Sequence, residues 1–137
     1  MTGPSITELA ELIRAGLDVD EALALEAPGC RWHIGNAVDP TQPCNVHTFP
    51  EARGVADGLN WLVAEHIARH NPERVLAEVA ARRQLLDQAL AWEHHAGDRN
   101  PMGEPCQATH GGACDCGRDE RVHAVLQALA TPYRETT

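Results

Sequence analysis

Apolar side chains recur at helical spacing in four separate stretches of the chain, and the first covers residues 5–27. It opens with Ser5-Ile-Thr-Glu8, a capping box in which the serine and glutamate bond each other's backbone N–H groups. Its apolar face consists of Leu9, Leu12, Ile13 and Leu17. Gly16 weakens the middle of the stretch, so we expect one long kinked helix or two short ones before Pro28.

The other three helical stretches lie in the second half of the chain. Residues 59–70 place Leu59, Leu62, Val63, His66, Ile67 and His70 on one broad face. Residues 72–95 carry a stripe of Val75, Leu76, Val79, Leu86 and Leu90. Asn71-Pro72 separates these two helices, because asparagine is a good N-cap and proline is favoured at the first helical position. The last helix is expected over 118–131.

Two stretches lack the helical period. Residues 30–58 contain two short strand candidates, 30–35 and 46–49, separated by loop chemistry, which predicts a small β-hairpin with an irregular segment after Pro50. Residues 96–117 are rich in Gly, Pro, Asp and Asn, and so long a loop in a compact domain needs something to hold it. We therefore predict a single, mainly α domain over 1–137 with a small β element. Its segments are 1–29, 30–58, 59–95, 96–117 and 118–131.

Composition supports this fold class and narrows the functions. Only 4% of the 137 residues are aromatic against 43% hydrophobic, so the core must come from aliphatic side chains, which favours helices. The net charge of −9 argues against direct binding of nucleic acid or anionic lipid. The first residues lack the pattern of a signal peptide, and no apolar run is long enough to cross a membrane. We expect a cytoplasmic protein.

The loop CQATHGGACDCG carries the strongest chemical signal. It contains Cys106, His110, Cys114 and Cys116, and His94 and His95 precede it at the expected helix end. In a reducing compartment such a cluster is more often a metal site than a disulfide framework. Thiolate and imidazole suit zinc, which takes four such ligands in structural sites. The C-x-C spacing is tighter than in common zinc fingers, so unpaired thiols or a redox element remain alternatives.

His66 and His70 form a second candidate pair. Their i, i+4 spacing puts both rings on one side of a helix, where a metal can bridge them or where they can complete the cysteine site. The protease pattern H-E-x-x-H is absent, because Glu65 precedes the first histidine instead of following it. The alternative is that His66 packs on the apolar face and His70 stabilises the helix C-terminus.

The stretch EHIARHNPERVLAEVAARRQLL, together with segments such as LDVDEALA (17–24), RWHI (31–34) and LATPY (129–133), resembles a family of small proteins from actinobacteria and their phages. That family is catalogued as a domain of unknown function. Its characteristic element is an HIARH stretch followed by Asp or Asn, Pro and an RVLAEV-like sequence. The resemblance covers most of the chain and implies Cys and His residues between the last two helices, but no activity.

The expected function is a non-catalytic, zinc-stabilised interaction or regulatory protein, plausibly phage-encoded and acting on a host protein. A metal-dependent hydrolase using His66, His70 and Glu65 is one alternative, and it requires an open coordination position beside a pocket. An acidic nucleic-acid mimic that inhibits a DNA-binding protein is another, given the charge of −9. The oligomeric state cannot be read from these patterns.

Overall fold

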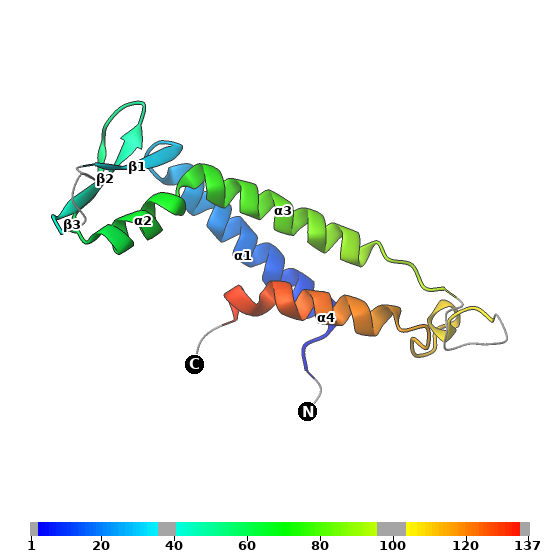
Figure 1. The fold of residues 1–137 in the computed structure, drawn as a ribbon. Helices are drawn as coiled ribbons and strands as arrows, with labels where there is room; N and C mark the ends of the chain where they lie inside the picture. The colour runs from blue at the N-terminus through cyan, green and yellow to red at the C-terminus, as the bar shows by residue number, and fades with distance from the viewer. Residues whose placement is uncertain (1–2, 36–40, 96–103, 135–137) are drawn as a thin grey trace. The chain divides into compact units, whose positions relative to one another are not determined.

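The structure, a computed structural model, describes residues 3–35, 41–95 and 104–134 (Figure 1). It is mainly helical with a small antiparallel sheet, as expected. The helices are α1 (Ile6–Glu26), α2 (Trp61–Arg69), α3 (Pro72–Leu90) and α4 (Arg118–Ala130), with short 3₁₀ helices η1 (Gln107–His110) and η2 (Thr131–Tyr133). The strands are β1 (Arg31–Gly35), β2 (Cys44–Phe49) and β3 (Gly54–Leu59). The chain groups into two compact units, Asp18–Ala81 and Met1–Leu17 with Arg82–Thr137.

Helix α1 runs without a break from Ile6 to Glu26, so one long helix is confirmed and the alternative of two short helices is wrong. The capping box is confirmed: Ser5 N donates to Glu8 Oε2 at 2.7 Å, and Glu8 N donates to Ser5 Oγ at 3.2 Å. These bonds from the Ser5 backbone and hydroxyl hold the pKa of Glu8 below its ordinary value. Gly16 makes room for a neighbour, because a Cβ there would lie 2.2 Å from Cδ1 of Tyr133. A helix-weakening residue is thus used for close packing rather than as a hinge.

The first unit comprises the first part of α1, the end of α3 and all of α4. Its fully buried aliphatic side chains come from all three helices and include Leu9, Ile13, Leu17, Leu86, Val122 and Leu126. His123 Nε2 on α4 lies 2.8 Å from the Pro4 carbonyl oxygen, which joins the start of α1 to α4. The predicted apolar stripe of α3 is confirmed by its most buried members, Val79 and Leu86.

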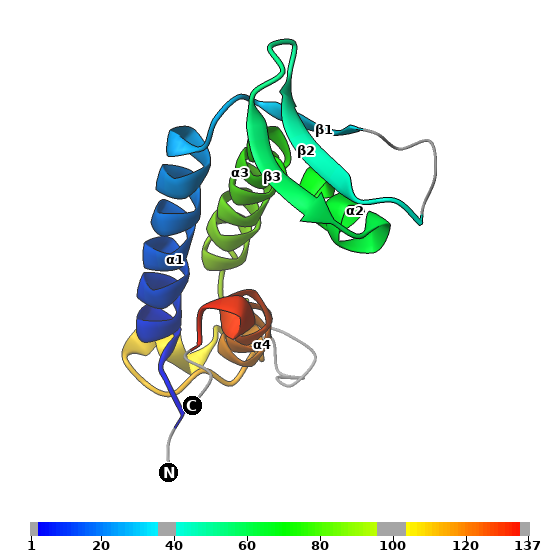
Figure 2. The same cartoon turned by 90° about the vertical axis from the view of Figure 1, so that its left-hand side faces the viewer.

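In the second unit, β2 is the central strand of a three-stranded sheet in the order β1-β2-β3 (Figure 2). Strand β1 pairs with β2 so that His33 lies opposite His47, and their rings stack with centroids 6.3 Å apart. Cys44 and Val46 of β2 and Ala64 of α2 are the buried centre, and Trp32, Trp61 and Ile67 pack against them. The sheet thus uses one face to cover α2.

Three sequence expectations for this unit need correction. The segment after Pro50 contains β3, and Leu59 ends that strand instead of starting a helix. Helix α2 begins at Trp61 after Asn60, whose Oδ1 accepts from Val63 N at 3.0 Å. The predicted apolar face of this segment is confirmed for Leu59 and Ile67, which pack against the buried centre with Trp61. It is wrong for Leu62, Val63, His66 and His70, which are exposed. Asn71 does cap α3, accepting from Arg74 N at 3.0 Å.

Candidate metal centre

Four metal-ligating side chains of the first unit converge on one point. The Nδ1 atom of His94 lies 3.4 Å from Cys106 Sγ, 3.4 Å from Cys114 Sγ and 3.6 Å from Cys116 Sγ. Cys114 Sγ and Cys116 Sγ are 3.7 Å apart, and all four donor atoms lie within 4.8 Å of one another. Over residues 3–35, 41–95 and 104–134, no other group of three or more His, Cys, Asp or Glu donors comes this close. These four residues could hold a metal ion.

The four donors lie between His94 and Cys116, and the ends of helices and a short 3₁₀ helix position them. Helix α3 ends at Leu90. The expectation that His94 lies on the last turn of this helix is therefore wrong, because His94 comes four residues after the helix ends. Cys106 immediately precedes η1, and Cys114 and Cys116 lie in the turn before Gly117, which caps α4. Gly117 turns the chain into α4 with a φ of 83°, a left-handed conformation that favours glycine. The cluster therefore joins the end of one helix to the beginning of the next.

The first turn of α4 supports the cysteine pair. The backbone N–H of Asp119 donates to Cys114 Sγ at 3.5 Å. The N–H groups at a helix N-terminus have no intrahelical acceptor, and the sulfur of Cys114 supplies one here. Cys106 and Cys116 are buried, and Cys114 is partly buried. The sulfur atoms are therefore shielded from water on the side of the helix.

Asp115, between the two cysteines of the C-x-C pair, ties them to η1. Its Oδ1 accepts from the backbone N–H of Gln107 at 3.0 Å. This bond, with a weaker contribution from the Cys106 side chain, holds the pKa of Asp115 below its ordinary value. Thr109 Oγ1 donates to the carbonyl oxygen of Cys106, the residue before η1, at 2.6 Å. The loop is thus hydrogen-bonded within itself as well as through the donor cluster.

Arg118 connects the two helices that flank the cluster. Its guanidinium is largely buried and donates to the carbonyl oxygens of Leu90 at 3.0 Å and Trp92 at 2.8 Å. These carbonyls follow the end of α3, where intrahelical donors run out. Arg118 Nη1 also donates to Asp119 Oδ1 at 2.8 Å. One side chain thereby satisfies the end of α3 and orients the carboxylate beside the cluster.

Asp119 is positioned to orient the histidine of the cluster. Its Oδ1 lies 3.5 Å from His94 Nε2, the ring nitrogen that faces away from the sulfur atoms. A carboxylate behind a ligating imidazole fixes the ring and raises its basicity, and losing such a partner typically costs 10- to 100-fold in metal affinity. Because this carboxylate is partly exposed and the separation is long, we expect Asp119→Asn to weaken metal binding by about tenfold.

A competition titration against a chelating indicator measures that affinity. Glu120→Gln is the matched control, because Glu120 is the neighbouring acid in the same first turn of α4. It removes the same charge from the helix N-terminus while leaving the His94 partner in place. Equal dissociation constants for the two variants would show that Asp119 acts only through the helix dipole.

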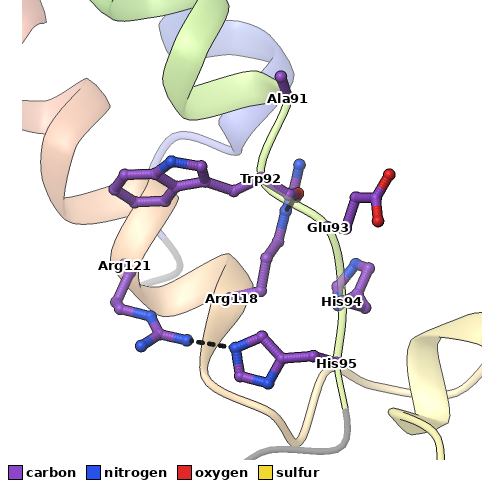
Figure 3. Close-up of a pocket in the computed structure, with 7 residues that line it drawn as sticks. All are labelled: Ala91, Trp92, Glu93, His94, His95, Arg118 and Arg121. Carbon is purple, nitrogen blue, oxygen red and sulfur yellow. Dashed lines mark hydrogen bonds between the residues drawn. The ribbon is translucent and has the colours of Figure 1, made fainter.

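The other histidines proposed as ligands lie outside the cluster. His95 points the other way, and its Nε2 lies 3.2 Å from Arg121 Nη2 (Figure 3). His110 is exposed on η1. His66 and His70 belong to the second unit; their rings are 4.3 Å apart, and His70 Nδ1 lies 2.7 Å from the His66 carbonyl oxygen. That bond uses one nitrogen of His70 to cap α2, as the capping interpretation predicted, but His66 is exposed, so its predicted packing on the apolar face is wrong.

A pocket of about 580 Å³ adjoins the cluster on the His94 side. Figure 3 shows Trp92, His95 and Arg121 around it, with Arg118 crossing between the chain after α3 and helix α4. His94 contributes to its wall. Sequence reasoning identified the four cluster residues among eight candidates, but it missed Asp119 and Arg118. The only available signal for them was their place directly after the C-x-C pair, at the start of a predicted helix.

Comparison with known proteins adds a family but no activity. None of the helices in the described part of the chain is long and apolar enough to span a membrane. Searches of curated proteins and of solved structures gave no match. The model of a family of unknown function, DUF6221, matches residues 6–136. The actinobacterial or phage origin implied by the sequence resemblance stays a prediction. The chain belongs to this family of unknown function, DUF6221.

Proposed function

We propose that this protein is a non-catalytic interaction protein whose first unit is stabilised by one zinc ion on His94, Cys106, Cys114 and Cys116. The observation that carries the proposal is the spacing of the four donor atoms. In a regular tetrahedron with Zn–S bonds of about 2.3 Å and Zn–N bonds of about 2.0 Å, sulfur atoms lie about 3.8 Å apart and nitrogen lies about 3.5 Å from sulfur.

Four of the six donor–donor separations match that tetrahedron, and the two between Cys106 Sγ and the other sulfur atoms are within 4.8 Å. The S–S distance of Cys114 and Cys116 is 3.7 Å, and the N–S distances from His94 are 3.4, 3.4 and 3.6 Å. Three thiolates and one imidazole form a soft donor set of the kind that selects zinc over magnesium or calcium. The match supports zinc, and the tight C-x-C spacing is compatible with it because the two sulfurs already lie one tetrahedral edge apart.

The same geometry supports a structural rather than a catalytic role. Catalytic zinc sites keep a coordination position open for water or substrate, whereas structural sites fill all four with protein ligands. Here four protein donors are available, and two of the cysteines are buried. A zinc ion with four protein ligands stabilises the fold around it and leaves no position for a substrate. The function then lies in binding a partner. The partner is proposed to be another protein; a host protein of a phage is the version favoured by the sequence resemblance alone.

The two alternatives have weaker support. For the hydrolase, Glu65 lies 3.3 Å from Arg69 in an ion pair, and His70 already uses Nδ1 in capping α2. The ion pair engages the carboxylate that a general base would need, and among the described residues no third His, Cys, Asp or Glu donor joins His66 and His70. The only observation that favours the nucleic-acid mimic is the net charge of −9. If the chain fails to compete with DNA for DNA-binding proteins, the nucleic-acid mimic is refuted.

Native mass spectrometry with metal analysis of untagged, reduced protein tests the proposal. We expect one zinc per chain. Substitution with Co²⁺ then tests closure: a four-ligand site gives the visible spectrum of tetrahedral thiolate-bound cobalt, and added azide leaves that spectrum unchanged. Metal-free protein would refute the zinc site, and a spectrum that shifts with azide would reveal an open position and favour an enzyme.

A further inference from the structure

The three cysteines of the cluster differ in their access to solvent. Cys106 and Cys116 are buried, whereas Cys114 is partly exposed. The sulfur atom of Cys114 also lies 3.7 Å from that of Cys116. Cysteines that sense oxidants in proteins are accessible thiolates with a second cysteine beside them, which reacts with the first oxidised product. Cys114 and Cys116 have this arrangement.

Bound zinc keeps these sulfur atoms reactive toward an oxidant. The thiolate, and not the thiol, is the form of cysteine that acts as a nucleophile. A cysteine that ligates a metal ion is deprotonated, whereas an ordinary free thiol is mostly protonated at pH 7. With zinc on the cluster, Cys114 is therefore a thiolate that an oxidant in solution can reach.

The turn that contains the C-x-C pair favours a bond between its own two cysteines. Asp115 Oδ1 accepts from Gln107 N at 3.0 Å, and Asp119 N donates to Cys114 Sγ at 3.5 Å, so both sides of the turn are held. Residues two apart in a turn fall within the Cα separation of about 4.4–6.8 Å that disulfides span. Such a disulfide closes a small, strained ring, and strained disulfides are the ones that thiols readily reduce again.

We propose that Cys114 and Cys116 form a redox switch, which releases the zinc ion when a peroxide oxidises the pair to a disulfide. The inference rests on the proposed function, since it gives the regulation of the proposed zinc site. It assigns different roles to the three cysteines of the cluster. Cys114 meets the oxidant, Cys116 completes the disulfide, and Cys106 stays reduced.

The reaction takes place in two steps. The thiolate sulfur of Cys114 attacks one oxygen of hydrogen peroxide, and the O–O bond breaks to give a sulfenic acid and hydroxide. The thiolate of Cys116 then attacks that sulfur, forms the S–S bond and displaces a second hydroxide. The two sulfur atoms together lose two electrons, which the peroxide gains. Two protons from solvent convert the two hydroxides to water.

The disulfide removes two of the four zinc ligands. Of the cluster, His94 and Cys106 are left, and a structural zinc site needs four ligands. The zinc ion therefore leaves as Zn²⁺, with its own charge unchanged. Because the ion links the end of α3 to the start of α4, its release unfolds the first unit and removes any partner bound there. Reduction by a thiol, with zinc present, reverses the change.

Hydrogen peroxide added to the full-length, zinc-loaded chain tests the switch. A coloured zinc indicator measures release of the ion, circular dichroism measures the helical signal, and peptide mapping without reductant identifies the cysteines that are joined. We expect zinc release, loss of helical signal and the disulfide between Cys114 and Cys116 to appear at the same rate. A thiol reductant with added zinc should restore the starting protein.

Cys30 provides a comparison within the same chain, because its thiol is exposed and lies in the second unit. At pH 7 we expect peroxide to oxidise Cys114 at least about fivefold faster than Cys30, because zinc holds the first as a thiolate. Cys30→Ser is the matched control variant. It should release zinc in peroxide at the same rate as the unchanged chain.

Cys114→His separates the exposed thiolate from metal binding. Two cysteines and two histidines also form structural zinc sites, so this variant keeps four donors. Its remaining cluster cysteines, Cys106 and Cys116, are buried. We expect one zinc per chain and a release in peroxide that is about tenfold slower, because access to the thiolate governs the reaction.

Three results would overturn the inference. Oxidation of Cys30 before any zinc is released would show that the cluster is closed to peroxide. A disulfide that includes Cys106 would show that Cys114 and Cys116 are not the reacting pair. Sulfinic acid at Cys114, which thiols do not reduce, would make the change irreversible damage. Zinc content is measured before peroxide is added, so zinc-loaded protein that keeps its metal refutes the switch and leaves the structural zinc site standing, whereas metal-free protein refutes both.

Discussion

Removing the zinc is expected to unfold the unit formed by residues 1–17 and 82–137. The proposed ion links the end of α3, the segment before η1 and the start of α4. Structural zinc in small domains contributes about 10–16 kcal/mol of binding free energy at neutral pH, and whole domains are stable by only about 5–15 kcal/mol. Losing it therefore removes most or all of the stability of this unit. Circular dichroism during chelation should show loss of helical signal, with recovery when zinc is returned.

Cysteine variants separate this effect from side reactions of the chelator. Cys106→Ser removes a buried member of the cluster and should abolish stoichiometric zinc and lower the melting temperature in the same way as chelation. Cys30→Ser is the matched control, because Cys30 is exposed and lies in the other unit. It should keep one zinc and the original melting temperature. A Cys106→Ser chain as stable as Cys30→Ser would mean that the loop is held without metal.

Leu86→Ala is expected to lower the free energy of unfolding by about 2–5 kcal/mol, the range for truncating a buried leucine. Leu86 is 2% exposed on α3, among the aliphatic side chains of the first unit. Its deletion leaves a cavity that the surrounding helices fill only in part. Urea denaturation followed by circular dichroism, on zinc-loaded protein, measures the change.

The adjacent residue is a close control. Leu85 is 51% exposed on the same helix, so Leu85→Ala makes the same chemical change with the same effect on helix propensity. We expect its free energy of unfolding to stay within about 0.5 kcal/mol of the original. Similar losses from both variants would indicate that the side chains of α3 are not buried as the structure has them.

Much of the helical framework was predictable because its signals are local. The capping box of Ser5 and Glu8, the cap of Asn71 and the buried stripe containing Leu86 each depend on residues within a few turns. Strand β3 was missed because its sequence, GVADGL, has two glycines and no clear alternation. Its pairing with β2 is irregular as well. Pairing with β2, which ends at Phe49 just before β3 begins, makes this segment a strand although its own pattern does not predict one.

Helix α2 and the metal ligands show a different limit. Both sides of α2 carry apolar residues, and the period of the sequence cannot choose between the face of Leu62 and Val63 and the face of Trp61, Ala64 and Ile67. His94 and His95 are likewise equivalent in the sequence. They are separated because the chain after Leu90 is not helical, which points successive side chains in different directions. Choices of this kind are made by tertiary contacts, not by local pattern.

The bonds from Arg118 to the carbonyls of Leu90 and Trp92 have a consequence for how the sequence can vary. They connect the end of α3 to the start of α4 through contacts separate from the proposed metal ligands. The entropic cost of closing a loop grows only logarithmically, by about 0.6 kcal/mol for each doubling of its length. Insertions between His94 and Cys106 can therefore accumulate at little cost while α3, α4 and the cluster keep their places. Because of the Arg118 contacts, we expect the length of the segment between His94 and Cys106 to vary among related sequences while the lengths of α3 and α4 stay the same.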